Sequence, residues 1–322
     1  LRKPSHMDEM KKNHISPIDV LVVNLYPFAN TIEHPECELE DAIENIDIGG
    51  PTLIRGAAKN WENIFVVTKN EQYAPLLKHL KSDDKKSIRQ FRFNLAKDAF
   101  AHTAAYDGTI SNYFALNSLE SSEPMFPKTH FLNLKKIQDL RYGENPHQKA
   151  AFYTESQRAP AGIGNYIQLH GKDLSYNNLV DSDAAWECVC SFVDPACVIV
   201  KHANPCGVAT STEALGAYKK ALSTDPTSAF GGIIAFNTKV NHKLAESVTE
   251  KFVEVIIAPE FSQESIEIIK GKKNLRALLV KPTKAQPGYD IKRIGNGLLL
   301  QTKDVQICDL SNSKIPTKKK PA

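Results

Sequence analysis

The sequence predicts an α/β protein of two domains, because apolar runs of strand length alternate with stretches of helical length along most of the chain. Its 322 residues are enough for about two domains of roughly 150 residues each. Hydrophobic residues make up 42% of the chain and charged residues 24%, as is typical of globular domains with a sizeable core. We therefore expect buried strands that form mainly parallel sheets, with helices on their faces.

The first half supplies the elements of one domain. An apolar run predicts a strand at 18–24, and a second strand is expected at 64–68. Between them, residues 51–60 are expected to be helical, with Pro51 in the first turn, where proline is best tolerated. Residues 86–116 have the apolar spacing of helices interrupted by one or two breaks, and the serine, proline and charge of 117–130 predict the domain linker.

The second half repeats the alternation without an internal sequence repeat. Helices are expected at 178–192, 212–222, 242–252 and 262–269, and strands at 196–200, 233–236, 253–258 and 275–280. In open α/β sheets ligands bind beyond the carboxyl ends of the strands, so functional side chains are expected there.

Composition disfavours several classes of protein. The net charge of +3 is small and evenly spread, and the basic run in the polar tail at 306–322 is typical of a solvated segment, so no nucleic-acid partner is expected. No apolar run approaches the roughly 18 residues of a membrane span. The six cysteines are irregularly spaced and mostly in apolar segments, which favours buried, reduced thiols and a cytoplasmic location. The chain begins at Leu1, so a targeting segment before it stays open.

A first candidate site follows the strand at 18–24. Tyr26 lies on the loop after that strand, and about twenty residues later the sequence IDIGGPT leads into a helix. Two glycines and free helix N–H groups are suited to bind a phosphate or carboxylate, and Arg55 and Lys59 lie four apart on the same helix face. The candidate residues of this anion-binding site are Gly49, Gly50, Thr52 and Arg55. An ordinary turn, helix cap and solvated basic face explain the same pattern, and both interpretations stay open.

A second candidate site follows the strand at 196–200. That strand leads into Lys201 and His202, and the chain is expected to turn on the Asn-Pro and Gly that follow. Histidine has an unperturbed pKa of roughly 6.5, which suits proton transfer at neutral pH. The segment 141–148 (RYGENPHQ) is equally rich in hydrogen-bonding groups. A structural strand end and a polar hairpin connection are the alternatives.

The second half of the sequence contains two further candidate motifs, a glycine-rich loop and a partial zinc-site motif. The glycine-rich loop at 224–232 (TDPTSAFGG) leads into a strand and, together with Glu254, is suited to complete a pocket for a sugar or base. The order His202, Pro205, Cys206 resembles the zinc site of nucleoside deaminases, which use His-x-Glu and Pro-Cys-x-x-Cys. Asn204 stands at the glutamate position and Ala209 at that of the second cysteine, so we expect no catalytic metal.

Taken together, nine ordered motifs resemble one enzyme family. They are NLYPF, ENIDIGG, AAKN, HTAAYD, RYGENPHQ, LSYNN, VKHANPCG, DPTSAFGG and VEVIIAP, between about residues 14 and 302. This set is similar to the bifunctional purine biosynthesis proteins of bacteria, in which AICAR formyltransferase is joined to IMP cyclohydrolase.

The resemblance implies a fold and a division into domains. It implies a methylglyoxal-synthase-like, doubly wound partial domain, followed by a cytidine-deaminase-like α/β subdomain without the deaminase zinc. We expect the cyclohydrolase part with a helical segment at 1–116, the linker at 117–130, the first formyltransferase subdomain at 131–305 and the polar tail at 306–322. The family's other segments are expected to be missing at both ends, so the chain is expected to be a truncated version of the enzyme.

The resemblance also implies an activity and site residues. A formyl group passes from 10-formyltetrahydrofolate, the co-substrate, to the 5-amino group of AICAR, and FAICAR then closes to IMP with loss of water. The cyclohydrolase residues implied by the motifs are Tyr26, Asp47 and Lys59. Those implied for formyl transfer are Arg141, Tyr142, Asn178, Lys201, His202, Phe230, Gly231 and Glu254. Nucleotide and folate are the expected partners, and a homodimer is expected for the complete enzyme.

Two alternatives to this enzyme stay open. The first is a catalytically inactive nucleotide-binding or assembly remnant, which the expected missing ends favour. The second is a nucleoside deaminase, which Asn204 and Ala209 disfavour.

Overall fold

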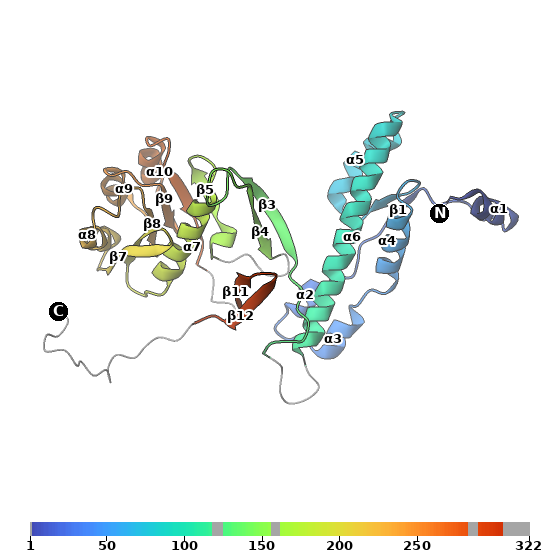
Figure 1. Cartoon of the computed structure of the whole chain (residues 1–322), viewed down its shortest axis with the longest axis horizontal. Coiled ribbons are helices and arrows are strands. Elements are labelled where there is room, and N and C mark those ends of the chain that lie inside the picture. The colour runs from blue at the N-terminus through green and yellow to red at the C-terminus, as the bar shows by residue number, and fades with distance from the viewer. Residues whose placement is uncertain (1, 118–124, 156–161, 283–288, 305–322) are drawn as a thin grey trace. The chain divides into compact units, whose positions relative to one another are not determined.

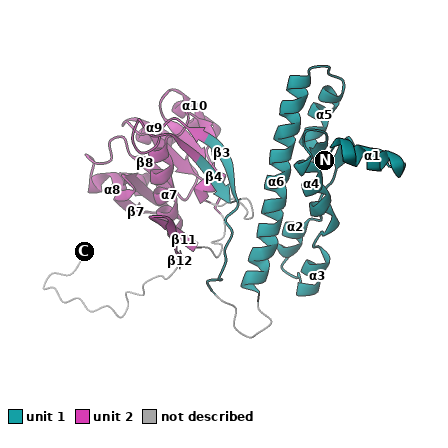
Figure 2. Ribbon diagram, turned by 45° about the vertical axis from the view of Figure 1, so that its right-hand side comes forward, with its two compact units in different colours: residues 1–138, 152–159 teal, residues 139–151, 160–322 magenta. Residues whose placement is uncertain are grey.

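A computed structural model describes residues 2–117, 125–155, 162–282 and 289–304, and the chain divides into two compact units. The first unit comprises Leu1–Gln138 and Phe152–Ala159, and the second comprises Asp139–Ala151 and Pro160–Ala322 (Figure 2). Part of the expected linker and the whole expected tail at 306–322 lie outside the described residues. Within the described part, no helix is both long enough and apolar enough to span a membrane.

The first unit packs its helices beside a short parallel sheet (Figure 1). Its elements are α1 (Pro4–Lys12), β1 (Val20–Val22), α2 (Phe28–Ile32), α3 (Leu39–Glu44), α4 (Gly49–Lys59), β2 (Phe65–Val67), η1 (Asn70–Gln72), α5 (Tyr73–Leu80) and α6 (Lys85–Leu116). Both expected strands and the helix between them are therefore present, with bounds shifted by two residues or less at most ends.

The core of the first unit lies between this sheet, α4 and α6. Strands β1 and β2 pair in parallel, with Val20 opposite Phe65. Helix α4 contributes Ile54, Ala57 and Ala58, which recur at intervals of three and four residues and therefore share one face. Helix α6 contributes Leu95, Ala96 and Ala99 to the same cluster.

Helix α6 is continuous, so the expected breaks within 86–116 are wrong. No proline interrupts it, and Asp84 caps its start by accepting hydrogen bonds from the backbone N–H groups of Lys86 and Ser87 at 3.0 and 3.1 Å. The single glycine in the helix, Gly108, is buried, and a Cβ there would lie 3.2 Å from the side-chain nitrogen of Asn133. A close neighbour, rather than a bend, accounts for this glycine.

The second unit is built around a six-stranded sheet. Its elements are η2 (Gly162–Asn165), β5 (Ile167–His170), α7 (Tyr176–Cys190), β6 (Ala196–Lys201), β7 (Asn204–Thr210), α8 (Ala214–Thr224), β8 (Ile233–Phe236), α9 (His242–Thr249), β9 (Val255–Ala258), α10 (Gln263–Lys270), β10 (Arg276–Leu279), β11 (Tyr289–Ile294) and β12 (Gly297–Thr302). The last two strands form a hairpin of their own. Strand β3 (Leu134–Leu140) pairs with β4 (Ala150–Glu155), and most residues of both strands belong to the first unit.

The strand order β5-β10-β9-β8-β6-β7 corrects the expectation of a mainly parallel sheet. Only the β8–β9 and β9–β10 pairs are parallel, whereas β6 runs antiparallel to both β7 and β8, and β5 antiparallel to β10. The cause is local: β6 and β7 are joined by two residues, and such a short connection permits only an antiparallel hairpin.

Helices cover both faces of this sheet. Strands β8 and β9 are buried along their whole length, as continuous apolar strands between two helical layers should be. One alternate set of side chains, including Ile199, Ile234 and Ile256, forms a buried cluster with α8, α9 and α10. Helix α7 packs on β6, β8 and β9 and therefore covers the strand side chains on the opposite face of the sheet.

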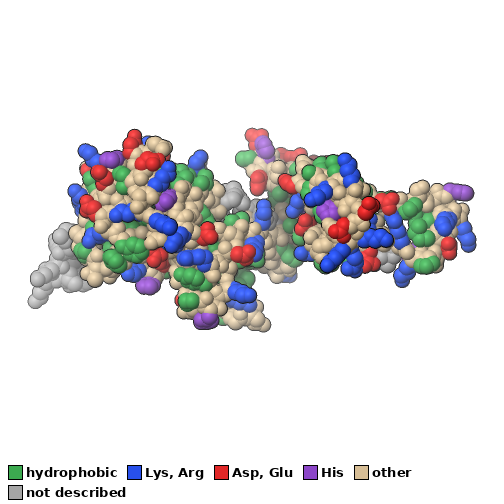
Figure 3. Space-filling view, turned by 90° about the horizontal axis from the view of Figure 1, so that it is seen from above, with side chains coloured by type: hydrophobic (Ala, Val, Ile, Leu, Met, Phe, Trp, Pro, Cys, Tyr) green, Lys and Arg blue, Asp and Glu red, His purple; other side chains and the backbone are tan. Residues whose placement is uncertain are grey.

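The cysteines differ in part from expectation, whereas the charges are mixed as expected. The five described cysteines are unpaired, but only Cys197 is buried, and Cys190 is exposed. The expectation of generally buried thiols is therefore wrong, because helical positions near the end of α7 face solvent on one side. Lys and Arg side chains are interspersed with Asp and Glu over the face of each unit shown in Figure 3.

Candidate functional site

In the first unit, Asp47 joins the loop after β1 to the start of α4. One carboxylate oxygen accepts a hydrogen bond from the backbone N–H of Gly50 at 2.6 Å, and the other accepts one from the backbone N–H of Tyr26 at 3.4 Å. The Tyr26 side chain itself is exposed. The Asp47 carboxylate thus contacts the backbone of Tyr26 just after β1, next to a helix N-terminus.

Only the second of the two glycines is required by close packing. A Cβ on Gly50 would lie 2.7 Å from a carboxylate oxygen of Asp47 and 2.7 Å from a methyl carbon of Leu25, whereas a Cβ on Gly49 would have no neighbour within 4 Å. The glycine pair was predicted to allow close approach of a ligand. At Gly50, the group that approaches the backbone is the carboxylate of Asp47 rather than a ligand.

The other predicted residues of this site are spread along α4. The Thr52 hydroxyl donates to the Ile48 carbonyl at 3.0 Å, and the Arg55 guanidinium lies 5.8 Å from the centre of the Phe100 ring. Lys59 is the last residue of the helix, ten positions after Gly49, which corresponds to about 15 Å along the axis. The described contacts bring Tyr26, Asp47 and Gly50 together but not Lys59.

One residue of this cluster was given no role from the sequence. The Tyr106 hydroxyl, on α6, accepts a hydrogen bond from the Asp47 backbone N–H at 2.8 Å and donates one to the Asn45 carbonyl at 3.1 Å. Its ring also contacts the buried Phe28 edge-on, with centroids 6.3 Å apart. The motif HTAAYD contains this tyrosine, but nothing in its sequence indicates contacts about sixty residues away.

In the second unit, Lys201 and His202 lie at the β6–β7 hairpin. Lys201 pairs with Asn204 across the hairpin, so His202 and Ala203 form the two-residue turn. Their φ angles of 54° and 58° are both positive, as a type I′ turn requires. The expected turn on Asn-Pro and Gly is therefore wrong: those residues belong to β7, an edge strand, where proline is tolerated.

Side-chain contacts hold this unusual turn. The backbone N–H of Ala203 donates to the Asp181 carboxylate at 2.7 Å, and the Asn204 side-chain amide donates to the His202 carbonyl at 2.8 Å. Positive φ is uncommon outside glycine and costs energy, so these contacts offset local strain. The exposed imidazole is thus carried on a fixed backbone.

Lys201 connects the hairpin to the glycine-rich loop. Its ammonium donates to the Phe230 carbonyl at 2.8 Å. The next residue, Gly231, has a φ of +70°, and its N–H donates to the Phe252 carbonyl at 2.8 Å. A Cβ on Gly231 would also lie 3.2 Å from the Phe252 ring, so both the conformation and the space favour glycine.

Glu254 is held between α7 and β10. Its carboxylate accepts a hydrogen bond from the Asn178 side chain at 2.7 Å and lies 3.9 Å from a guanidinium nitrogen of Arg276. Arg276 is 6% exposed and donates to the carbonyls of Lys172, Asp173 and Asn274. Burial lowers the pKa of Arg276, and the negative charge of Glu254 opposes that effect.

Arg141 and Tyr142 lie near the same group. The Arg141 guanidinium is 5.4 Å from the centre of the Tyr142 ring, and its positive charge also lowers the pKa of Arg276. The side-chain amide of Asn177 donates to the Glu144 carbonyl at 3.3 Å, which joins this loop to the start of α7.

The cluster of the second unit lies at an unexpected edge of the sheet. Gly232, Glu254 and Arg276 precede or begin β8, β9 and β10, so the group gathers at the amino ends of these three strands. Lys201 and His202 reach the same edge from the carboxyl end of β6 because β6 is antiparallel to β8. The carboxyl-end rule located these two residues, but it does not describe the parallel part of this sheet.

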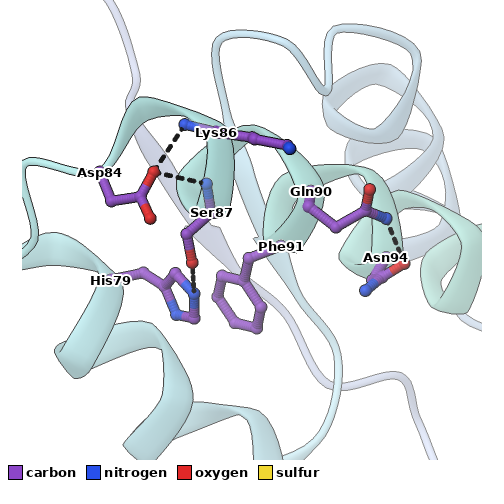
Figure 4. Close-up of a pocket in the computed structure, with 7 residues that line it drawn as sticks. All are labelled: His79, Asp84, Lys86, Ser87, Gln90, Phe91 and Asn94. Atoms are coloured by element: carbon purple, nitrogen blue, oxygen red, sulfur yellow. Dashed lines mark hydrogen bonds between the residues drawn. The ribbon is translucent and has the colours of Figure 1, made fainter.

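The two described hollows lie away from both clusters. The larger, of about 460 Å³, lies between α5 and the start of α6 in the first unit (Figure 4). There the His79 ring stacks on Phe91 at 4.1 Å, and its Nε2 atom is 3.2 Å from the Ser87 hydroxyl. A second, of about 200 Å³, is lined mainly by α6 and the segment 130–133. Both are shallow surface features.

Charged side chains suited to metal binding do not cluster at either site. Among the described residues, no group of three or more histidine, cysteine, aspartate or glutamate side chains has an arrangement that would bind a metal ion. Cys206 lies on β7, and its thiol contacts the Ile199 carbonyl at 3.5 Å.

Two family models match this chain and agree with these motifs. A solved structure described as "Crystal structure of ForH" has 28% sequence identity to this chain, with a TM-score of 0.28, and the match covers 35% of this chain and 59% of that one. The chain thus spans less than two thirds of that protein. Residues 2–52 match the MGS-like domain, and residues 57–322 match the family described as AICARFT/IMPCHase bienzyme. Because that match covers more than half of the sequence, the chain belongs to the AICARFT/IMPCHase bienzyme family.

Proposed function

We propose that this chain acts in the last two steps of purine-nucleotide synthesis. A formyl group passes from 10-formyltetrahydrofolate to the 5-amino group of AICAR, and FAICAR then closes to IMP with loss of water. The observation that carries the proposal is the bond from Lys201 to the Phe230 carbonyl, which joins two family motifs at one sheet edge. The family match over 57–322 favours this enzyme over an inactive remnant.

Formyl transfer is assigned to the cluster of the second unit. The 5-amino group is a weak nucleophile and must lose a proton, which His202 accepts as general base, while the bond from the formyl carbon to the folate nitrogen breaks and that nitrogen gains a proton to leave as tetrahydrofolate. Lys201 stabilises the negative charge that develops on the formyl oxygen. Arg141, with Tyr142 beside it, binds the phosphate or carboxamide of the nucleotide.

The remaining residues of this cluster form the walls of the nucleotide site. Phe230 presents an exposed ring for stacking, and Gly231 lets the backbone approach the ligand closely. Glu254, held by Asn178, is a hydrogen-bond acceptor for a sugar hydroxyl or a base N–H.

Ring closure is assigned to the cluster of the first unit. A carboxamide nitrogen attacks the formyl carbonyl, and the oxygen leaves as water. Tyr26 delivers a proton, and Asp47 orients the attacking amide. The N-terminus of α4, at Gly49 and Gly50, with Thr52 and Arg55 in the first two turns, binds the phosphate or the developing oxyanion.

Lys59 is the last residue of α4, at the opposite end of the helix from Gly49. It is proposed to stabilise the developing oxyanion and to reach the substrate from that end of the helix. The complete enzyme is proposed to be a cytoplasmic homodimer that uses no catalytic metal.

The test is a formyl-transfer assay on this chain with AICAR and 10-formyltetrahydrofolate, following release of tetrahydrofolate. His202→Ala should lower turnover by roughly 10²- to 10⁴-fold, as expected for loss of a general base. The matched control is His242→Ala, which removes another exposed imidazole, on α9, paired with Glu246 at 3.3 Å. Turnover unchanged in His202→Ala would refute the assignment, and a chain that binds AICAR without turnover would support the remnant instead.

A further inference from the structure

Tyr106 connects the two loops that contain the proposed cyclohydrolase residues. Its hydroxyl bonds to both sides of the short segment from Asn45 to Asp47, at 3.1 Å to the Asn45 carbonyl and at 2.8 Å to the Asp47 backbone N–H. Its ring lies against Phe28, two residues after Tyr26. One side chain from α6 therefore contacts the surroundings of both functional groups.

The hydrogen bonds of the Asp47 carboxylate depend on the position of the Asp47 backbone. The same residue that donates to Tyr106 uses its side chain to accept from the N–H groups of Gly50 and Tyr26. Gly50 leaves no free space behind the carboxylate, since even a Cβ would approach it to 2.7 Å. A shift of the Asp47 backbone would consequently move the carboxylate away from both donors.

The tyrosine is suited to this role at neutral pH. Its side chain is half-buried, and burial raises its pKa, so the hydroxyl keeps the proton that it donates to Asn45. Helix α6 is rigidly anchored in the core through Leu95, Ala96 and Ala99, which gives the hydroxyl a fixed position. The loop from Asn45 to Asp47 thus has a support that does not belong to its own segment.

From these contacts we infer that Tyr106 is a positioning residue for ring closure: it holds the Asp47 loop so that the carboxylate stays aimed between Tyr26 and the start of α4. This inference rests on the proposed function of Asp47. Tyr106 itself does not contact the reacting atoms in this assignment; it acts through Asp47.

The first test measures position without activity. Amide hydrogen exchange is compared in the whole chain and in Tyr106→Phe, which retains the ring but removes both hydrogen bonds. The informative amide is that of Gly50, which bonds to the Asp47 carboxylate and makes no hydrogen bond to Tyr106. We expect its exchange to accelerate by roughly 5- to 30-fold, the factor that corresponds to loss of one or two net hydrogen bonds.

The matched control is Tyr113→Phe. Tyr113 lies two turns further along α6 and packs edge-on against the same Phe28, with centroids 5.6 Å apart. Among the described contacts its hydroxyl makes no hydrogen bond to the Asp47 loop. Tyr113→Phe should leave exchange of the Gly50 amide unchanged. Equal exchange at Gly50 in Tyr106→Phe and the unmodified chain would overturn the inference.

The second test measures conversion of FAICAR to IMP. Tyr106→Phe should lower kcat by about the same 5- to 30-fold, with a smaller change in KM. In a chain that already carries Asp47→Asn, it should lower kcat little further, because both substitutions disrupt the same group of contacts. If Asp47→Asn leaves ring closure unchanged, the proposed function of Asp47 fails, whatever the exchange data say. If Asp47→Asn slows the reaction while Tyr106→Phe neither slows it nor accelerates Gly50 exchange, only the role of Tyr106 fails.

Discussion

Substitution of the two neighbouring glycines Gly49 and Gly50 by alanine should change stability in opposite directions. Both residues lie in the first turn of α4. A Cβ on Gly49 meets nothing within 4 Å, so Gly49→Ala should stabilise the first unit by about 0.4–1 kcal/mol through the smaller entropy of the unfolded chain. A Cβ on Gly50 lies 2.7 Å from both Asp47 and Leu25 and must displace them.

The cost of Gly50→Ala follows from these contacts. Forcing a methyl group into a packed site typically costs about 1–3 kcal/mol, and the Gly50–Asp47 hydrogen bond contributes about 1 kcal/mol that is lost if the carboxylate moves. The two variants should therefore differ by roughly 2–5 kcal/mol in the free energy of unfolding, after the gain at Gly49 is included.

Urea unfolding followed by tryptophan fluorescence can measure this difference. The chain contains two tryptophans, Trp61 in the first unit and Trp186 in the second, so a Trp186→Phe background reports the first unit alone. Ring closure should also slow in Gly50→Ala, because the added methyl group displaces the Asp47 carboxylate. Equal stability of the two variants would show that the Asp47 carboxylate moves without cost and would refute the tight packing of Gly50 against it.

Two further predictions concern charged side chains. Asp183 lies on α7 beside Glu187, and desolvation first, then the neighbouring carboxylate, raises its pKa above the usual 3.8, so its ionisation lowers stability as the pH rises above 3.8 and costs most above the folded-state pKa. Asp183→Asn should thus raise Tm at pH 7, with a gain that shrinks as the pH falls toward 3.8; a gain that stays constant in melting curves from pH 7 to 4 would contradict the assignment. Lys59→Ala should slow ring closure and spare formyl transfer, since Lys59 and His202 belong to different units; equal loss of both activities in a folded variant, measured in paired assays, would refute the two-site assignment.

The buried strands of the second unit were predictable because each is a continuous apolar run of four to six residues between helical segments. Strands β8 and β9 lie within two residues of their predicted bounds. Strand β7 was not predictable in the same way, since Pro205 argues against a strand unless the strand lies at an edge, and only the sheet order shows that it does. The turn that makes β6 antiparallel uses His202 and Ala203, which lack the Asn-Gly signal of such turns.

The candidate sites were predictable as residue types but not as contacts. Family motifs identified Asp47 and Glu254, yet the groups that hold them, Tyr106 and Arg276, lie on other elements and follow no local pattern. Periodicity reports which face of an element is buried, whereas a hydrogen bond between positions 59 residues apart depends on how the elements pack. The distance of Lys59 from the start of α4 was, by contrast, available from helix geometry alone.

The backbone at His202 suggests why the second site is built on a hairpin. A two-residue turn with positive φ is least strained with glycine or asparagine, and non-glycine residues in this region cost roughly 1–2 kcal/mol each. The chain places histidine and alanine there and offsets the strain with bonds from Asp181 and Asn204. A two-residue turn has no freedom to change register, so the backbone that carries the His202 imidazole is fixed next to Lys201. In the proposed reaction, a fixed backbone at His202 reduces the entropy that is lost when the imidazole and the nucleotide amine come together. The strained turn therefore serves catalysis in this assignment.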